Sequence, residues 1–282
     1  MKIGAIIVLY NPCKDLFKDV LLHTINQFDA VFIVDNSPMP YDDLDQYENI
    51  TYHFIGENKG IATAQNIGIN YFEEKNYDFI VFLDQDSIPS DDLSEKLLSA
   101  YKILNDQKIK IGAIGARPYN RNSNKPYANT SSRNLKIADN ITEVTEIISS
   151  SSLIPVANFK VVGKMEDDLF IDGVDHEWCW RATKIAKYRF FIAEDVLLSH
   201  QLGEGDKFLL YRNVAISTPF RTYYQFRNYF RLLPRKYVPL YWKIVNGVKY
   251  LIKYFYFPLM VPPRWEYFKS INKGIFDAIL RR

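Results

Sequence analysis

Cysteine is scarce in this chain of 282 residues: Cys13 and Cys179 are its only two, and they form no C-x-x-C pair. A disulfide framework and a cysteine-based zinc site are therefore excluded. No continuous apolar run reaches the roughly 18 residues that a membrane-spanning helix needs. The chain also lacks a Walker A motif, a G-x-G-x-x-G fingerprint and the small-residue cleavage pattern of a secretory signal. These absences favour a protein of the reducing cytoplasm.

Charge is distributed very unevenly along the chain. Residues 1–206 carry 20 Lys and Arg against 31 Asp and Glu, whereas residues 207–282 carry 15 against 2. The first part has a net charge of −11 and the second of +13, and the second also holds 20 of the 43 aromatic residues. We therefore predict an acidic body over residues 1–206 and a basic, aromatic, helical extension over residues 207–282.

Apolar runs alternate with helical patterns along the body. Short β-branched runs predict buried strands, and apolar residues spaced three or four apart predict helices. The predicted strands are 3–10, 30–34, 52–55, 80–83, 111–116, 189–192 and 196–198, and the predicted helices are 15–28, 61–72, 90–104 and 178–187. This alternation indicates a mostly parallel sheet with helices on both faces. The polar segment 117–140, rich in Asn and Ser, is predicted to be a surface loop.

The most informative stretch is 80–90, which reads IVFLDQDSIPS. Four apolar residues of a predicted strand lead directly into Asp84, Gln85, Asp86 and Ser87. Ligands of open α/β sheets bind at the carboxyl ends of the strands, and carboxylates two residues apart can face the same ligand. Carboxylate oxygens are the ligands that Mg²⁺ and Mn²⁺ prefer. A metal site is one interpretation, and a polar turn before the next helix is the other.

Two further stretches lie where a nucleotide could bind. Asp35 follows the predicted strand 30–34, where its carboxylate could accept the imide N–H of uracil or thymine or could simply begin a turn before Pro38. Residues 58–68, NKGIATAQNIG, place small residues around the start of a helix. The backbone N–H groups of such a helix start attract phosphate, although a tightly packed helix is the alternative interpretation.

A second concentration of chemistry lies at residues 170–200. Asp175 could act as a general base, whereas Glu177 and Arg181 are four apart, which favours a structural ion pair. Trp178 could stack on a sugar ring or belong to the core. His200 follows the strand 196–198, where its imidazole could complete the coordination shell of a metal or have a structural role.

The extension alternates aromatic and basic residues. Arg227 and Arg231 share one face of a predicted helix, and Lys249 and Lys253 share a face of another. Basic amphipathic helices with Trp and Tyr bind anionic lipid surfaces, and this is the interpretation we favour. The alternatives are a single-stranded nucleic acid site and packing of the arginines on the acidic body.

Six stretches occur in a defined order over residues 3–203: VLYNP at 8–12, VDNS at 34–37, the stretch 58–68, LDQDS at 83–87, Asp175 with Glu177 and Arg181, and His200 with Gly203. Together they resemble the inverting glycosyltransferase family 2, of GT-A fold, and within it the bacterial rhamnosyltransferases of O-antigen and other surface polysaccharides. The resemblance implies an α/β fold with a Rossmann-like, mostly parallel central sheet. It also implies a nucleotide-sugar half at about 1–116 and an acceptor half at about 141–206.

The resemblance also implies roles for single residues. Asp35 corresponds to the acid that reads the pyrimidine base, and Asp84 to an acid near the ribose and diphosphate. Asp86 and His200 correspond to ligands of a divalent metal, Mg²⁺ or Mn²⁺, and Asp175 to the general base. Further nucleotide contacts would come from Asn58, Gly60 and Asn66, and weaker sugar contacts from Ser151, Ser152, Asp172 and Trp178. Many relatives have adjacent acids before the Glu, whereas Val174 precedes Asp175 here, so Asp172 is an alternative base.

The function so implied is metal-dependent transfer of a sugar, L-rhamnose from dTDP-rhamnose, onto a lipid-linked oligosaccharide. The protein would lie in the cytoplasm, peripheral on the inner face of the plasma membrane, with no nucleic acid partner. UDP-galactose or another UDP-hexose is an alternative donor. A non-catalytic nucleotide-binding membrane adaptor is the alternative of a different class.

Overall fold

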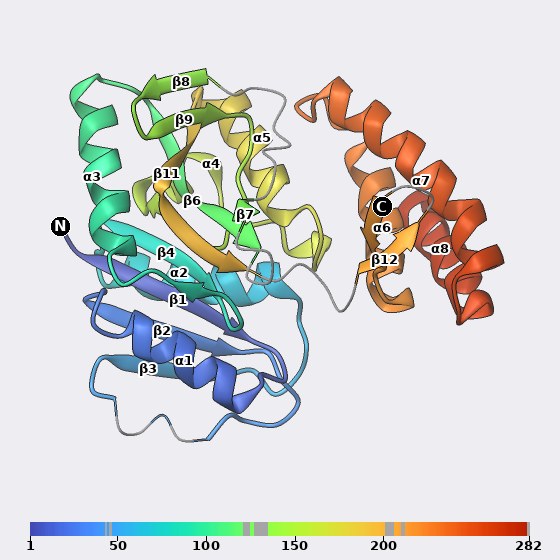
Figure 1. The fold of residues 1–282 in the computed structure, drawn as a ribbon, viewed down its shortest axis with the longest axis horizontal. Coiled ribbons are helices and arrows are strands. Elements are labelled where there is room, and N and C mark those ends of the chain that lie inside the picture. The colour runs from blue at the N-terminus through green and yellow to red at the C-terminus, as the bar shows by residue number, and fades with distance from the viewer. Residues whose placement is uncertain are drawn as a thin grey trace.

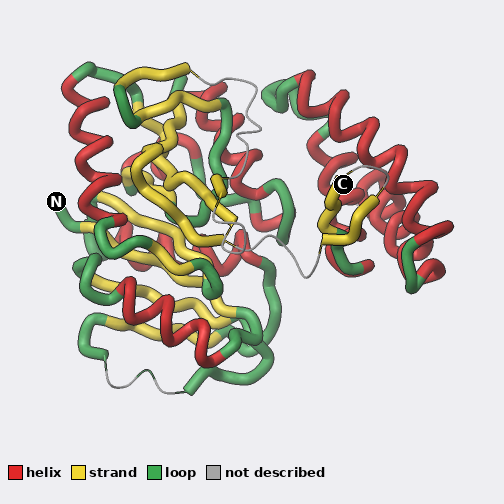
Figure 2. The backbone as a smooth tube through the Cα atoms, in the orientation of Figure 1, coloured by secondary structure: helices red, strands yellow, loops and turns green. Residues whose placement is uncertain are grey.

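The computed structural model describes residues 1–42, 44, 47–120, 125–126, 135–200, 206–209 and 212–280. The body is an α/β sandwich, and the extension is a separate group of helices beside it (Figures 1 and 2). The mixed α/β architecture predicted from the sequence is confirmed.

The strands of the body form one large sheet. Its order is β3-β2-β1-β4-β10-β6-β11-β9-β8, with β5 paired to β11 and β7 to β6. The strands are β1 (Ile3–Leu9), β2 (Ala30–Asp35), β3 (Ile50–Phe54), β4 (Phe79–Asp84), β5 (Ile88–Pro89), β6 (Ile111–Asn120), β7 (Lys125–Pro126), β8 (Leu135–Ala138), β9 (Ile141–Val144), β10 (Ser152–Pro155) and β11 (Arg189–His200).

The direction of the strands divides the sheet into two parts. Strands β3, β2, β1 and β4 are all parallel, as predicted. Strand β10 then runs antiparallel between β4 and β6, so its first residues lie at the carboxyl end of β4. The two predicted strands at 189–198 are one strand, β11, whose register on β6 shifts between Ala193 and Leu197. The predicted loop 117–140 was wrong in part, because β6 continues to residue 120 and β7 and β8 lie within it.

Helices cover both faces of the sheet because each carries an apolar stripe of helical period. Helices α1 (Lys14–Thr24) and α3 (Leu93–Asp106) pack on one face, where Phe17 and Leu97 are fully buried. Helices α2 (Ile61–Glu74), α4 (Ala157–Val162) and α5 (Val174–Ala186) pack on the other, where Phe72 and Trp178 belong to the core. A short 3-10 turn, η1 (Asp167–Leu169), precedes α5.

The extension consists of a hairpin and three helices. Strands β12 (Asp206–Leu209) and β13 (Arg212–Ala215) pair with each other, and helices α6 (Pro219–Leu232), α7 (Leu240–Met260) and α8 (Arg264–Leu280) follow. The helices enclose a small core of their own around Phe226, Phe257 and Tyr267. None of the helices in the described part of the chain combines the length and the apolar character needed to cross a bilayer.

Candidate active site

The predicted site residues gather at the carboxyl edge of the parallel strands. Asp35 is the last residue of β2 and Asp84 the last of β4, and both strands pair with β1. Gln85 ties this edge together, because its side-chain amide exchanges two hydrogen bonds with the backbone of Tyr10, at 2.7 and 3.1 Å. Buried strands that end in polar residues at one edge form the usual ligand site of open α/β sheets.

Asp35 is fully buried and holds a turn. One carboxylate oxygen accepts the N–H of Ser37 at 2.9 Å, and the other accepts the N–H of Tyr41 at 2.9 Å and the hydroxyl of Tyr52 at 2.6 Å. Burial and the hydrogen bond to Asp35 raise the pKa of Tyr52, so this hydroxyl stays a donor at neutral pH. The recognition of a pyrimidine base by Asp35 stays a prediction, and the structure adds that the same carboxylate fixes residues 35–41.

An asparagine pair connects this turn to the start of α2. The Asn36 amide donates to Asn58 Oδ1 at 3.0 Å and accepts the backbone N–H of Lys59 at 2.8 Å. Asn58 Oδ1 also accepts the N–H of Gly60 at 3.0 Å. The segment predicted to approach a phosphate is therefore held in place by its own Asn58 and by Asn36, the residue that follows β2.

Residue 60 must be a glycine because its backbone lies directly against Phe170. It has φ of 87°, which favours glycine, and a Cβ here would lie 2.7 Å from the carbonyl oxygen of Phe170. That carbonyl accepts the N–H of Ile61, the first residue of α2, at 2.7 Å. The first amide of the helix is thus occupied by protein, which favours the alternative interpretation of a tightly packed helix for this group.

The backbone positions of the predicted metal ligands lie near one another in the fold. Asp86 is exposed in the turn between β4 and β5, and Asp84, two residues earlier at the end of β4, is partly exposed. Strand β5 pairs with β11 so that Ser199 lies opposite Ile88, which brings the backbone of His200 to the level of this turn. The His200 side chain lies outside what the structure describes. Among the described residues no cluster of three or more His, Cys, Asp or Glu is positioned to hold a metal.

This donor set suits a cation that shares its coordination shell with a substrate. Mg²⁺ and Mn²⁺ in phosphate-binding sites are held by one or two carboxylates, with phosphates and water as the remaining ligands. Asp84 and Asp86, with accessible carboxylates at the strand ends, fit this requirement.

Asp175 reaches the same sheet edge through the serine turn 149–152. Its carboxylate accepts the N–H of Ser149 at 3.3 Å and the N–H of His176 at 2.9 Å. The serine turn is anchored to β4, because the N–H of Ser151 donates to Phe82 at 2.6 Å and Ser152 pairs with Phe82. Asp175 is therefore connected, by two short steps, to the strand that ends in Asp84. A small cavity beside the serine turn is lined by Ser149, Ser152 and Asp175 together with apolar residues of β10 and α5.

The segment before Asp175, residues 165–173, has a strained backbone. Phe170 and Asp172 have φ of 62° and 64°, and Gly173 has φ of 88°. A left-handed conformation costs a non-glycine residue roughly 1–2 kcal/mol, and such residues persist only where their surroundings fix them. Here Asn228 of α6 donates to three carbonyls of the segment, Leu169 at 2.8, Ile171 at 2.7 and Asp172 at 2.9 Å. We call this stretch the base segment.

The two candidate bases have different partners. Asp172 is held by Arg221, whose Nε and Nη2 donate to its carboxylate at 2.8 to 3.0 Å. Within the described part of the chain, Asp175 accepts hydrogen bonds only from backbone N–H groups, and it stands half-buried in the first turn of α5. A carboxylate clamped by a guanidinium must break that pair before it can take a proton, so the geometry favours Asp175.

Several other predicted contact residues face the protein interior. Trp178 is buried in the core and donates its indole N–H to the carbonyl of Gly163. The predicted stacking of Trp178 on a sugar ring was therefore wrong. Asn66 exchanges hydrogen bonds with the backbone of Met165 and thus anchors the base segment to α2. The hydroxyl of Ser152 donates to Ser149, whereas that of Ser151 is buried without a hydrogen-bond partner within the described structure. Both serines are buried, so a direct sugar contact needs the turn to open.

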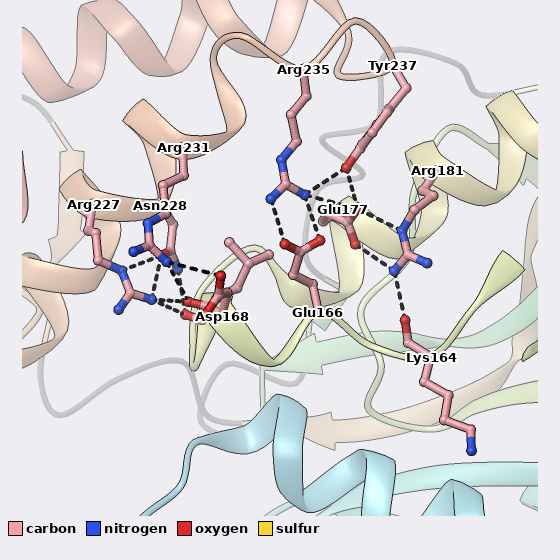
Figure 3. A network of polar contacts seen from close by, with 11 residues as sticks. Lys164, Glu166, Asp168, Glu177, Arg181, Arg227, Asn228, Arg231, Arg235 and Tyr237 are labelled. Carbon is pink, nitrogen blue, oxygen red and sulfur yellow. Dashed lines mark hydrogen bonds and ion pairs between the residues drawn. The ribbon is translucent and has the colours of Figure 1, made fainter. Parts of the chain in front are cut away.

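Sequence analysis missed a polar network that joins the extension to the body (Figure 3). Arg235 donates to both oxygens of Glu166 at 2.6 and 2.7 Å, and Tyr237 donates to Glu177 at 2.6 Å. Glu177 is fully buried and forms the predicted ion pair with Arg181 through two bonds, at 2.8 and 2.9 Å. The excess of positive charge after residue 206 and of negative charge before it was the one signal that could have indicated this interface.

The arginines of α6 also face the body rather than solvent. Arg227 and Arg231 both donate to the carbonyl of Asp168. Burial, followed by the nearby Arg231, lowers the pKa of Arg227. For these arginines the alternative of packing on the acidic body is correct, and their assignment to a lipid-facing surface was wrong.

Comparison with known proteins agrees with this architecture. The sequence model of glycosyl transferase family 2 matches residues 5–153. The chain is 32% identical over 285 residues to the dTDP-rhamnosyl transferase RfbF of Shigella flexneri, covering 98% of this chain and 95% of the relative.

Solved structures also share the fold of this chain. Residues 1–349 of Staphylococcus aureus TarS superpose with a TM-score of 0.58 at 15% identity, over 100% of this chain and 82% of that fragment. The complex of the same TarS fragment with UDP-GlcNAc gives 0.59, over 99% and 82%. GalNAc-T7 with UDP, GalNAc and Mn²⁺ also gives 0.59 at 15% identity, over 97% of this chain and 55% of that protein.

The fold and the site edge define a glycosyltransferase of the GT-A type. The chain belongs to glycosyltransferase family 2, and it is an enzyme related to a rhamnosyltransferase over nearly its full length. The family, fold class and enzyme class predicted from the sequence are thereby confirmed.

Proposed function

We propose that this enzyme transfers L-rhamnose from dTDP-rhamnose onto a lipid-linked oligosaccharide. The observation that carries the proposal is the 32% identity to a dTDP-rhamnosyl transferase over 98% of the chain, which includes the extension as well as the body. If the sequence identity were confined to the sheet, it would support only the nucleotide-sugar binding of the first half of the body. We further propose that residues 1–206 form the catalytic domain and residues 207–282 the membrane-associating region.

In this proposal Asp175 is the general base of a single displacement. The acceptor hydroxyl attacks the anomeric carbon while its proton passes to the Asp175 carboxylate, and dTDP leaves from the opposite face, so the configuration inverts. A carboxylate placed in this way contributes roughly 10²–10⁴-fold to the rate. The backbone N–H groups of Ser149 and His176 support the role, because they orient the carboxylate without neutralising it.

A divalent metal held by Asp86 and His200, with Asp84 near the ribose and diphosphate, would supply positive charge for the diphosphate of the leaving nucleotide. The positions of Asp84 and Asp86 at the strand end support this assignment. Titration calorimetry with dTDP tests it without turnover. Mn²⁺ should tighten dTDP binding to the wild type, and Asp86→Ala should remove most of that increment. An equal Mn²⁺ effect in both proteins would contradict the role of Asp86.

We propose that the extension contacts the inner membrane surface through α7. Eight large apolar side chains follow one side of this helix and are more than half exposed: Leu240, Tyr241, Ile244, Val248, Leu251, Ile252, Phe255 and Leu259. A continuous exposed apolar strip on a basic region is typical of helices that lie in a lipid interface. Leu251→Ser with Phe255→Ser should weaken sedimentation with phosphatidylglycerol vesicles, and unchanged sedimentation would argue against this surface.

The donor and the enzyme class are tested together with purified protein. Release of dTDP from dTDP-rhamnose in the presence of Mn²⁺ or Mg²⁺ is expected, at a rate well above that with UDP-galactose. A preference for a UDP-hexose would change the proposed donor and would leave the enzyme class unchanged. Binding of nucleotide without turnover of any sugar nucleotide in a panel would instead support the adaptor alternative.

A further inference from the structure

A pocket lies between α6 and α8, outside the site edge described above. Its volume is about 330 Å³, and it is lined by Phe220, Tyr223, Tyr224, Lys269, Ser270 and Lys273. The two helices run side by side (Figure 1), and they approach closely at Gly274, where a Cβ would lie 2.5 Å from the carbonyl oxygen of Tyr223. The pocket walls are therefore fixed by helix packing, and its volume is in the range of sites for small organic ligands.

The pocket combines cationic and aromatic side chains. Lys269 and Lys273 are exposed, and neither has an ion-pair partner among the described residues. Lys273 Nζ lies 5.6 Å from the centre of the Tyr223 ring, and the Phe220 and Tyr224 rings meet edge to face at 5.1 Å. Two unpaired ammonium groups beside an aromatic wall match a phosphate ester that also carries an apolar chain or a ring.

The pocket is joined to the base segment through its aromatic wall. The Tyr224 ring stacks on Phe170 with centroids 4.5 Å apart and 7° between the planes. Arg221, one turn earlier on the same helix, clamps Asp172. The pocket wall and the residues that precede the proposed base thus belong to one packed unit.

Large apolar side chains are also exposed along α8. They are Trp265, Phe268, Phe276, Ile279 and Leu280, and Lys269 and Lys273 are exposed on the same helix. Lysines among exposed apolar side chains extend toward the phosphates of an interface while their stems pack on apolar groups. A lipid chain along α8 would therefore bring its phosphate to the pocket.

We propose that this pocket binds the phosphate or diphosphate that links the acceptor sugar to its lipid. The proposal rests on the proposed function, since it assumes a lipid-linked acceptor. Lys269 and Lys273 bind the phosphate oxygens, Phe220, Tyr223 and Tyr224 contact the adjoining chain, and the sugar extends past Phe170 toward Asp175.

The test uses geranyl diphosphate as a soluble probe, with geraniol as its phosphate-free counterpart. Titration calorimetry is carried out on the full chain with saturating dTDP and Mg²⁺, so that the nucleotide site is already filled. Lys269→Gln with Lys273→Gln should weaken geranyl diphosphate binding by about tenfold or more. The matched control, Lys236→Gln with Lys249→Gln, removes two exposed lysines of the extension outside the pocket and should change binding less than about twofold.

Three results of the titration would overturn the proposal. They are absence of geranyl diphosphate binding by the wild type, equal binding by wild type and pocket variant, and equally tight binding of geraniol. A pocket variant that loses only sedimentation with phosphatidylglycerol vesicles, and keeps geranyl diphosphate binding, would reassign the lysines to membrane headgroups and also overturns it. The titration needs no sugar donor, so a wrong donor assignment would leave its result standing.

Discussion

The three hydrogen bonds of Asn228 offer a sharp test of how the extension positions the base. This side chain is 2% exposed, and its amide donates to the carbonyls of Leu169, Ile171 and Asp172. Asn228→Leu keeps the volume of the side chain and removes both donor hydrogens. The left-handed conformations of Phe170 and Asp172 then lose the contacts that fix them.

The magnitude follows from the carbonyls that are left without a donor. A buried acceptor without a partner costs about 1–3 kcal/mol. Leu169 is fully buried, whereas Ile171 and Asp172 are partly exposed and water can reach their carbonyls. We therefore expect a loss of about 2–4 kcal/mol of unfolding free energy, which corresponds to a fall in Tm of roughly 5–12 °C.

Turnover should fall more than donor affinity in Asn228→Leu. The base segment would sample other conformations and Asp175 would be misplaced, whereas β2, β4 and the start of α2 hold the nucleotide edge independently. We expect kcat to fall by about tenfold or more with the KM for the sugar nucleotide nearly unchanged. The assays are thermal unfolding and steady-state release of dTDP.

Asn272→Leu is the matched control for this variant. Asn272 donates to the carbonyl of Phe268 within its own helix and accepts one long hydrogen bond, 3.4 Å, from the hydroxyl of Tyr254, so its replacement should cost less than about 1 kcal/mol. If Asn228→Leu resembled Asn272→Leu in both Tm and kcat, the base segment would not depend on α6, and the argument would be refuted.

Three further predictions concern the base, the interface and α2. Asp175→Asn should abolish transfer while dTDP binding persists in calorimetry, whereas Asp172→Asn should retain at least about a tenth of the turnover. A near-normal rate in Asp175→Asn would show that Asp175 is not the general base. The hydrogen bond from Arg235 lowers the pKa of Glu166 below its ordinary value of 4.5 in the folded state. This carboxylate therefore stabilises the folded state at pH values above 4.5, and the stabilisation is lost as the pH falls through the lower, folded pKa. Thermal unfolding from neutral to acid pH should show this loss in wild type but not in Glu166→Gln, and identical pH profiles would contradict it. Gly60→Ala should lose roughly 1–3 kcal/mol of unfolding free energy, measured in urea, because its Cβ would meet the Phe170 carbonyl; an unchanged midpoint would show that this approach is not tight.

The strands and the site edge could be predicted from sequence because both are local patterns. A parallel strand buried on both faces is a continuous apolar run, and a ligand site at its end appears as an abrupt change to acids. Asp84 and Asp86 after β4 and Asp35 after β2 carry this signal without any knowledge of the tertiary structure. The mixed half of the sheet was harder to predict, because β8, β9 and β10 are short, and β9 and β10 depend on pairing with strands distant in the sequence.

Roles that depend on long-range partners could not be predicted. Asp172 and Asp175 look alike in sequence, and they differ in the structure because Arg221, 49 residues away, clamps Asp172. Trp178 carries no local sign of whether it faces a ligand or the core. In α6 the spacing of Arg227 and Arg231 indicated a basic face, but periodicity does not reveal which surface covers that face.

The charge division of the chain has two consequences rather than one. Part of the positive charge of the extension is used internally, since Arg221, Arg227, Arg231 and Arg235 all bond to the segment 166–172 that leads to the base. Lys249, Lys269 and Lys273 remain exposed for anionic partners. The extension, which exposes apolar side chains on α7 and α8, thus also holds the residues before Asp175 through α6 and Arg235. A displacement of α7 or α8 at the proposed lipid surface would be transmitted through α6, because α6 packs on both helices and its Asn228 and Arg221 contact the base segment directly. Membrane attachment and correct placement of the base would then be linked by direct contacts rather than by a flexible tether.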